Sequence, residues 1–224
     1  MLLALSLQQQ PCLIFVSVTN CTLVTRPGLA YALYDAENFQ GVVEQLNDPR
    51  LTVADAQRCC VALYTLLGAE EEAERAATLT DAEAAGSLDA LLRCAALHVP
   101  HAGVQAACCS ALSEYVHTAQ RTEVASYPRI FQAVVAALKA YPLEVDVQGA
   151  ALLALRNACC FGLEGTPGVP ALLDAIPPVL AALRAFPTDL FVQEYGCESL
   201  HEMCKMDRLC GCGCGCCWRN APLH

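Results

Sequence analysis

The chain has 224 residues, of which 55 % are hydrophobic, 16 % charged and only 6 % aromatic. Its formal net charge of −10 repels phosphate backbones and anionic headgroups, so nucleic acid and membranes are disfavoured as partners and a protein or peptide is expected. Much of the apolar content is alanine and leucine, and aromatic residues are few, which predicts an all-α protein.

Residues 1–36 are predicted to be a non-repeat N-terminal segment. No charged residue occurs between Met1 and Thr25, and the run lacks the basic start and the small-residue cleavage site of a signal peptide. Gln8, Pro11 and Asn20 interrupt it too often for a membrane span. We therefore assign no targeting signal to this segment.

Residues 37–207 are predicted to form an array of helix pairs. In the first pair, Val42, Val43 and Leu46 have helical spacing, and DAQRCCVALYTLL (55–67) follows as the second helix. Residues 68–87, which contain a run of glutamates, predict either a solvated loop or a short acidic helix. Within them, Thr80 and Glu83 have the spacing of a capping box, which predicts a helix start near Asp81.

Three later segments align without gaps, and the 55–67 segment is a looser copy of them. They are GVQAACCSALSEY (103–115), DVQGAALLALRNA (146–158) and FVQEYGCESLHEM (191–203). Each begins with a Val-Gln pair and places a leucine on the same helical face, at Leu112, Leu155 and Leu200. Four residues after the valine the side chain is always small (Cys108, Ala151, Gly196), which predicts close approach of a neighbouring helix.

An apolar helix with matching spacing is predicted before each of these segments, although the one around residues 91–99 is less regular. A proline is expected to mark each turn within a pair, because proline cannot continue the helical hydrogen bonds. These prolines are Pro49, Pro100, Pro142 and Pro187.

A repeat of about 42–48 residues built from two or three helices resembles the armadillo/HEAT class. The pattern Leu-x-x-Phe-Pro-x-x-x-x-Val-Gln-Glu-x-Gly-Cys-x-x-Leu (183–200) is similar to armadillo repeats of the leucine-rich-repeat kinase 2 type, without the kinase. The resemblance covers about residues 37–207 and implies a right-handed α-solenoid of about four repeats. Residues 170–176, followed by Pro177 and Pro178, match the short first helix of an armadillo repeat and the sharp corner after it.

The resemblance also implies a non-catalytic protein-interaction scaffold, whose second helices line a concave groove for a partner segment. The residues expected to face this groove are Glu114, Arg156, Asn157, His201 and Glu202. Importin-type repeats hold peptide backbone through an asparagine at this point. Asn157 matches it, but Glu114 and Glu202 replace it in other copies, so a nuclear-import receptor is not expected. Acidic groove residues favour a basic partner segment.

The ends of the array lack polar outer faces, which repeat arrays need on their terminal units. Two interpretations remain open. The repeats belong to a longer array, or the chain self-associates through an uncapped end.

The 16 cysteines are interpreted mainly as buried free thiols, because Cys59-Cys60, Cys108-Cys109 and Cys159-Cys160 lie inside helical patterns. This predicts a reduced, intracellular and cytoplasmic chain. In the tail, residues 208–224, closely spaced thiols could hold adventitious zinc or copper, or could be low-complexity sequence. These thiols are Cys210, Cys212, Cys214, Cys216 and Cys217. The alternative function is therefore a thiol-rich metal-binding or redox protein that acts through its tail.

Catalytic motifs were sought and none was found. The sequence contains no phosphate-binding loop, no HExxH zinc motif and no GxSxG nucleophile elbow. The pair His98 and His101 flanks a proline and is interpreted as a surface turn. We therefore predict that the chain is not an enzyme and needs no cofactor.

Overall fold

A computed structural model describes residues 39–209, apart from residues 69–71, 120–126 and 163–168. The described part is all-helical and contains no strand. Its helices are α2 (Phe39–Leu46), α3 (Val53–Leu67), α4 (Glu72–Ala84), α5 (Ser87–Leu97), α6 (Ala102–Ala119), α7 (Tyr127–Ala140), α8 (Val145–Gly162), α9 (Val169–Ala185) and α10 (Leu190–Leu209). The predicted all-α class is confirmed.

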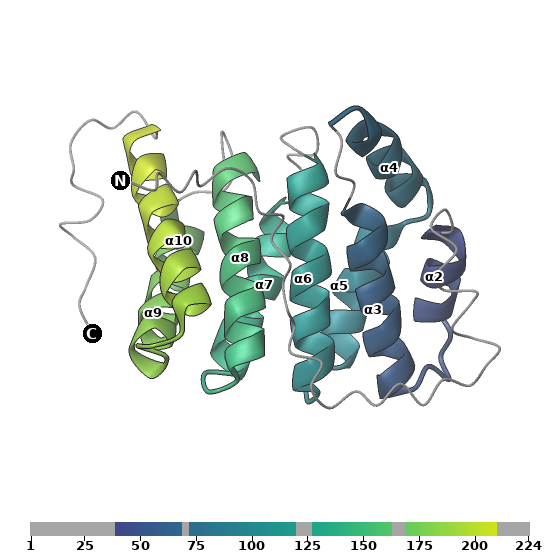
Figure 1. The fold of residues 1–224 in the computed structure, drawn as a ribbon, viewed down its shortest axis with the longest axis horizontal. Helices are drawn as coiled ribbons and strands as arrows, with labels where there is room; N and C mark the ends of the chain where they lie inside the picture. Colours follow the sequence, from purple (N-terminus) through teal and green to yellow (C-terminus); the bar gives the residue numbers. More distant parts are fainter. Residues whose placement is uncertain (1–38, 69–71, 120–126, 163–168, 210–224) are drawn as a thin grey trace, which may run out of the picture.

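The helices lie in two layers (Figure 1). One layer, which we call the front layer, consists of α3, α6, α8 and α10 side by side, and each packs against the next. Helices α2, α5, α7 and α9 form the layer behind it, and α4 lies against α3 and α6 near the start of the row. Each predicted pair therefore supplies one helix to each layer.

The prolines mark the turns within the pairs, as predicted. Helices α2, α5, α7 and α9 end two or three residues before Pro49, Pro100, Pro142 and Pro187, respectively. Polar side chains then start some of the next helices, since the first backbone N–H groups of a helix have no partner within it. Thr52 Oγ1 accepts from the N–H of Asp55 at 3.2 Å, and Asp189 Oδ1 accepts from that of Val192 at 2.9 Å.

The glutamine of each Val-Gln pair ties the front layer to the layer behind it. Its side-chain amide donates to carbonyl groups near the end of the preceding helix, which lack helical partners. Gln148 Nε2 donates to Leu138 O at 2.9 Å and to Tyr141 O at 2.8 Å. Gln193 repeats this arrangement on α9, and Gln105 donates to Ala95 O at 2.7 Å. The repeated glutamine is therefore a structural residue.

We expect Gln148→Leu to lower the free energy of unfolding by about 1–3 kcal/mol, because Leu138 O would lose its donor and Tyr141 O would keep only the N–H of Glu144, next to a fully buried side chain. Urea denaturation followed by circular dichroism measures this loss. The matched control is Gln132→Leu on the exposed side of α7, which should change stability by less than about 0.5 kcal/mol. Equal losses in the two variants would contradict the structural role.

Two sequence-based expectations are wrong. Helix α4 does not start near Asp81; it runs through Thr80, whose Oγ1 donates to Ala76 O at 2.9 Å within the helix. Burial of Leu79 and Ala82 favours this continuous helix, so the acidic-helix alternative was the correct one. Likewise, α9 has no corner at its two prolines but continues through them, because Val179 and Ala182 extend its buried face.

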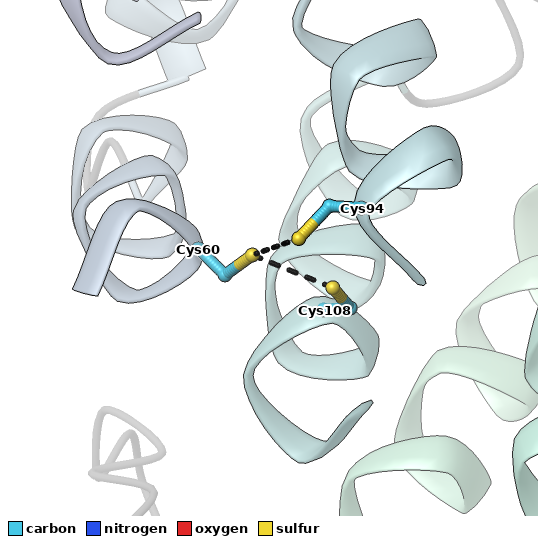
Figure 2. A group of neighbouring side chains, drawn as sticks. All are labelled: Cys60, Cys94 and Cys108. Carbon is cyan, nitrogen blue, oxygen red and sulfur yellow. Dashed lines mark hydrogen bonds between the residues drawn. The ribbon is translucent and has the colours of Figure 1, made fainter. Parts of the chain in front are cut away.

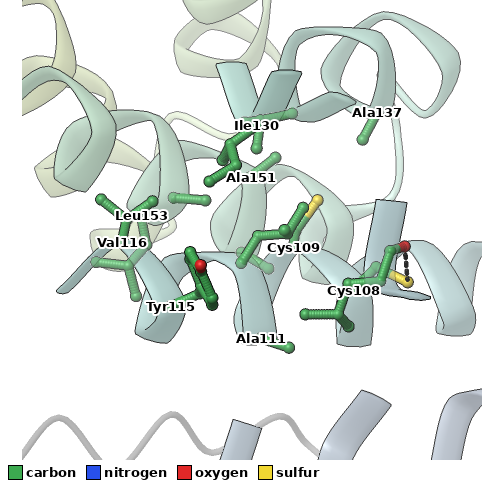
Figure 3. Close-up of a cluster of buried hydrophobic side chains, with 14 of the residues drawn as sticks. Cys108, Cys109, Ala111, Tyr115, Val116, Ile130, Ala137, Ala151 and Leu153 are labelled. Atoms are coloured by element: carbon green, nitrogen blue, oxygen red, sulfur yellow. Dashed lines mark hydrogen bonds between the residues drawn. The ribbon is translucent and has the colours of Figure 1, made fainter. Parts of the chain in front are cut away.

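The core consists mainly of small and aliphatic side chains between the layers and between neighbouring front helices. Figure 3 shows one part of it, which includes Cys109 and Tyr115 of α6, Ile130 of α7 and Ala151 of α8. The predicted close approach is clearest at Gly196, where an added Cβ would come within 2.6 Å of Leu183 Cδ2 on α9. Small side chains on the front helices therefore set the distance between the layers.

Candidate functional site

The predicted groove residues lie on the C-terminal halves of α6, α8 and α10, which are neighbours in the front layer (Figure 1). His201 is exposed, whereas Glu114, Arg156 and Glu202 are half-buried. Asn157 is buried, with 5 % of its surface exposed. The structure therefore brings these positions onto adjacent helices but differs from the expectation in how much of each side chain is accessible.

Asn157 links two front helices. Its side-chain amide donates to Ser113 Oγ at 2.9 Å and to Ser113 O at 3.3 Å on α6. Its Oδ1 accepts from Arg156 Nη1 at 2.9 Å. These bonds occupy the amide group that a peptide-binding asparagine would offer to a ligand. In the structure, Asn157 therefore holds two helices together. That it also binds peptide backbone stays a prediction.

Two of the charged groove residues, Arg156 and Glu202, have partners of opposite charge. Arg156 Nε lies 3.1 Å from Glu198 Oε2, which connects α8 to α10. Glu202 Oε1 lies 2.6 Å from Lys205 Nζ on the same helix. Such pairs are partly exposed and contribute little to stability. They do reduce the negative charge that this surface offers to a basic segment.

Glu114 and His117 lie 4.0 Å apart on α6 without forming a charged pair at neutral pH. Burial, with Arg75 and Arg156 nearby, lowers the pKa of His117, so its ring is neutral. Burial raises the pKa of Glu114, with a smaller opposing effect from Arg75. Ionised Glu114 therefore disfavours the folded state at neutral pH.

We expect Glu114→Gln to raise the melting temperature at pH 7 and to leave it unchanged at pH 4. The pKa of Glu114 is higher in the folded than in the unfolded state, so its ionisation destabilises the fold as the pH rises above the pKa of the unfolded state. Below that pKa the carboxyl is protonated in both states, and the effect vanishes. Thermal denaturation at both pH values measures this. Glu194→Gln, at an exposed position of α10, is the control and should change the melting temperature at neither pH. A lower melting temperature for Glu114→Gln at pH 7 would contradict the argument.

One edge of the front layer is unusually apolar. The turns between α2 and α3, α5 and α6, α7 and α8, and α9 and α10 all lie along this edge, at the bottom of Figure 1. Helices α3, α8 and α10 begin there with an exposed aliphatic side chain, and the last residue of α5 and the turns before α6 and α8 supply further ones. We call this set the turn edge: Val53, Leu97, Val99, Leu143, Val145 and Leu190.

The most exposed members of the turn edge are Leu143, at 78 %, and Leu190, at 83 %. A hydrogen bond from the Tyr141 hydroxyl to Val99 O fixes two consecutive turns relative to each other. This edge was not predicted from the sequence. Its signal was present, because an aliphatic residue adjoins Pro100 and Pro142 and another lies three residues after Pro187, where polar turn residues are usual.

Three buried cysteines meet between α3, α5 and α6 (Figure 2). Cys60 Sγ lies 3.7 Å from Cys94 Sγ and 3.4 Å from Cys108 Sγ, and all three sulfurs lie within 4.8 Å of one another. Each side chain is at most 2 % exposed. Hydrogen bonds from Cys108 and Cys60 lower the pKa of the Cys94 thiol, whereas those with Cys60 and Cys94 raise the pKa of Cys108. We call this set the cysteine trio.

Cys60 and Cys108 were predicted to be packing residues, and nothing in the sequence connected them with Cys94. No spacing rule could have found the trio, since its members come from three helices. Within the described residues it is the one group of three or more possible metal ligands whose donor atoms lie this close together. The tail cysteines proposed as metal ligands, Cys210 to Cys217, lie outside the described residues.

Other cysteines of the described part are also free thiols, in agreement with the sequence interpretation. His98 and His101 lie in the turn between α5 and α6, with ring centroids 6.1 Å apart. No described helix is both long enough and apolar enough to cross a membrane.

Comparison with known proteins adds no relationship. The chain matches no family model, and no curated protein and no solved structure is significantly similar to it. The resemblance to armadillo repeats therefore rests on the sequence pattern quoted above.

Proposed function

We propose that the chain is a non-catalytic protein-interaction scaffold, an α-solenoid of about four armadillo-like repeats that binds a partner protein along its turn edge. The observation that carries this proposal is the row of exposed aliphatic side chains along one edge of the front layer. These side chains recur at successive turns of one edge, and exposed apolar side chains gathered on one part of a folded domain are typical of protein-binding sites. The recurring two-helix unit and its repeated glutamine bonds support the repeat architecture.

The turn edge suits a protein partner because its apolar side chains stand on a rigid support. Its residues lie at helix starts and short turns, so little conformational freedom is lost when a partner covers them. The net charge of −10 favours a partner that carries lysine or arginine beside its apolar contacts. The partner would contribute an apolar segment with basic flanks.

The test is a quantitative affinity capture from cell lysate with the full chain and with the double variant Leu143→Glu, Leu190→Glu. Val61→Glu is the matched control, because Val61 is also exposed, at 43 %, but lies within α3 away from the turns. Circular dichroism must first show equal helicity. The scaffold proposal predicts a partner that the wild-type and control chains retain and the double variant loses, with binding reproduced by the purified partner.

A second variant, His201→Ala with Glu202→Ala, tests the groove expected from the sequence. If this variant loses the partner while the turn-edge variant keeps it, the binding surface is the groove on α6, α8 and α10 rather than the turn edge. If all variants capture the same proteins, neither surface is the binding site. Sedimentation velocity shows whether the partner is a second copy of the chain, since a self-associating wild type would become monomeric in the double variant.

A further inference from the structure

We propose that the cysteine trio is a buried site for a single Cu(I) ion bound by Cys60, Cys94 and Cys108. Figure 2 shows the three side chains pointing toward one another from α3, α5 and α6. This site is separate from the tail cysteines and from the turn edge, and it does not depend on the proposed scaffold function. Among the residues that the structure describes, other buried cysteines such as Cys109 and Cys159 belong to no such group.

The spacing of the sulfurs fits a bound ion. An ion at about 2.3 Å from three sulfurs, the usual metal–thiolate bond length, holds them about 4 Å apart in a plane. The distances from Cys60 Sγ to the other two sulfurs are 3.7 and 3.4 Å. The two distances from Cys60 Sγ therefore need to lengthen by only about 0.3 and 0.6 Å to reach this value. All three sulfurs already lie within 4.8 Å of one another, so rotation of the side chains can supply the change.

The donor set favours Cu(I) over Zn²⁺. Thiolates select soft ions, and both Cu(I) and Zn²⁺ bind them. Structural zinc sites are almost always four-coordinate, with four protein ligands. Here the described residues place three sulfurs together and no fourth His, Cys, Asp or Glu donor with them. The near-complete burial of the trio also keeps water from supplying a fourth ligand. Cu(I) accepts three sulfurs without a fourth ligand.

Binding would replace the hydrogen bonds of the trio with metal–sulfur bonds. The coordinating thiols lose their protons to solvent, and the copper stays Cu(I), so no oxidant or reductant is needed. The ion would join α3 of the first helix pair to α5 and α6 of the second. Because it binds the folded chain more tightly than the unfolded one, it would also stabilise that junction.

The experiment uses full-length chain in which the five tail cysteines are replaced by serine, so that they do not compete for copper. In this background Cys94→Ala removes one proposed ligand. Cys109→Ala is the matched control, because Cys109 is a buried cysteine of α6 outside the trio. Circular dichroism confirms that both variants are folded. Each protein is titrated anaerobically with Cu(I) against a chromophoric chelator and, separately, with Zn²⁺, both folded and during refolding.

The proposal predicts one tightly bound Cu(I) per chain in the background and in Cys109→Ala, with X-ray absorption showing three sulfurs around the copper. In Cys94→Ala the affinity should fall by on the order of a hundredfold or more, since replacing a residue that only hydrogen-bonds to a metal ligand already costs about 10–100-fold. Copper should also raise the melting temperature of the background but not of Cys94→Ala. Copper binding that does not depend on Cys94 overturns the site. A four-coordinate Zn²⁺ complex that Cu(I) does not displace overturns the choice of copper. If the purified protein is lighter by two hydrogens and a disulfide is mapped between two cysteines of the trio, the trio is a site of oxidation and the metal-binding proposal is overturned.

Discussion

Leu155→Ala is expected to lower the free energy of unfolding by about 2–5 kcal/mol, the range for a leucine removed from a closed core. Leu155 has no exposed surface and lies on α8, which packs against α6, α7 and α10. With neighbours on three sides, the structure cannot collapse easily into the cavity. Urea denaturation followed by circular dichroism measures the loss.

Leu200→Ala is the matched comparison, because Leu200 occupies the same position of the repeat but is only half-buried on α10. In the described part, α10 packs mainly against α8 and α9. We expect a loss of less than about 2 kcal/mol, because fewer contacts are removed and solvent reaches the site. Equal losses for the two leucines would show that the repeats are energetically equivalent and that position in the array does not matter.

Cys159 is expected to resist alkylation by iodoacetamide at pH 8 by about a thousandfold relative to Cys197 and Cys204, because only the thiolate reacts. Burial, the main cause, raises the pKa of the Cys159 thiol, with smaller effects from Cys160 and Glu202. Cys159 is also closed off from reagent, at 5 % exposed, whereas Cys197 and Cys204 are exposed on α10. Peptide mass spectrometry after timed labelling gives the rate at each cysteine.

The control for this prediction is the same labelling in urea, where all three cysteines should react at similar rates. Rapid native labelling of Cys159 would mean that α8 opens far more often than its packing indicates. In that case the interpretation of the paired cysteines as buried packing residues would fail. The prediction also separates ordinary buried cysteines from the trio, whose proposed role is tested by metal binding instead.

The turn edge and the cysteine trio lie in different parts of the array. The turn edge is exposed at the starts of the front helices, and the trio is buried between α3, α5 and α6. Leu143 and Leu190 belong to the later helix pairs, whereas the trio joins the first two. Loss of copper binding and loss of partner binding are therefore separable, and each variant proposed above tests one of them.

Hydrophobic periodicity and proline positions alone determined most of the helices. Val134, Val135 and Leu138 have helical spacing and are buried on α7, and Pro142 follows the end of that helix, because these signals are local. The predictions at Thr80 and Pro177, which rested on a capping-box spacing and on a proline pair, were wrong. There, local signals for a helix start or a break were outweighed by burial of Leu79 and Val179, which depends on neighbours distant in sequence.

The sequence by itself determined the all-α class, the paired helices and the small residues of their interfaces, since each depends on residues within a turn or two of one another. Only the tertiary structure decided what those residues do. It buried Asn157 against Ser113, where the sequence suggested a ligand contact. It also brought Cys60 into contact with Cys94 and Cys108, which lie 34 and 48 residues further along the chain. Side chains that meet across helices are placed by the packing of whole elements, and no local pattern records that packing.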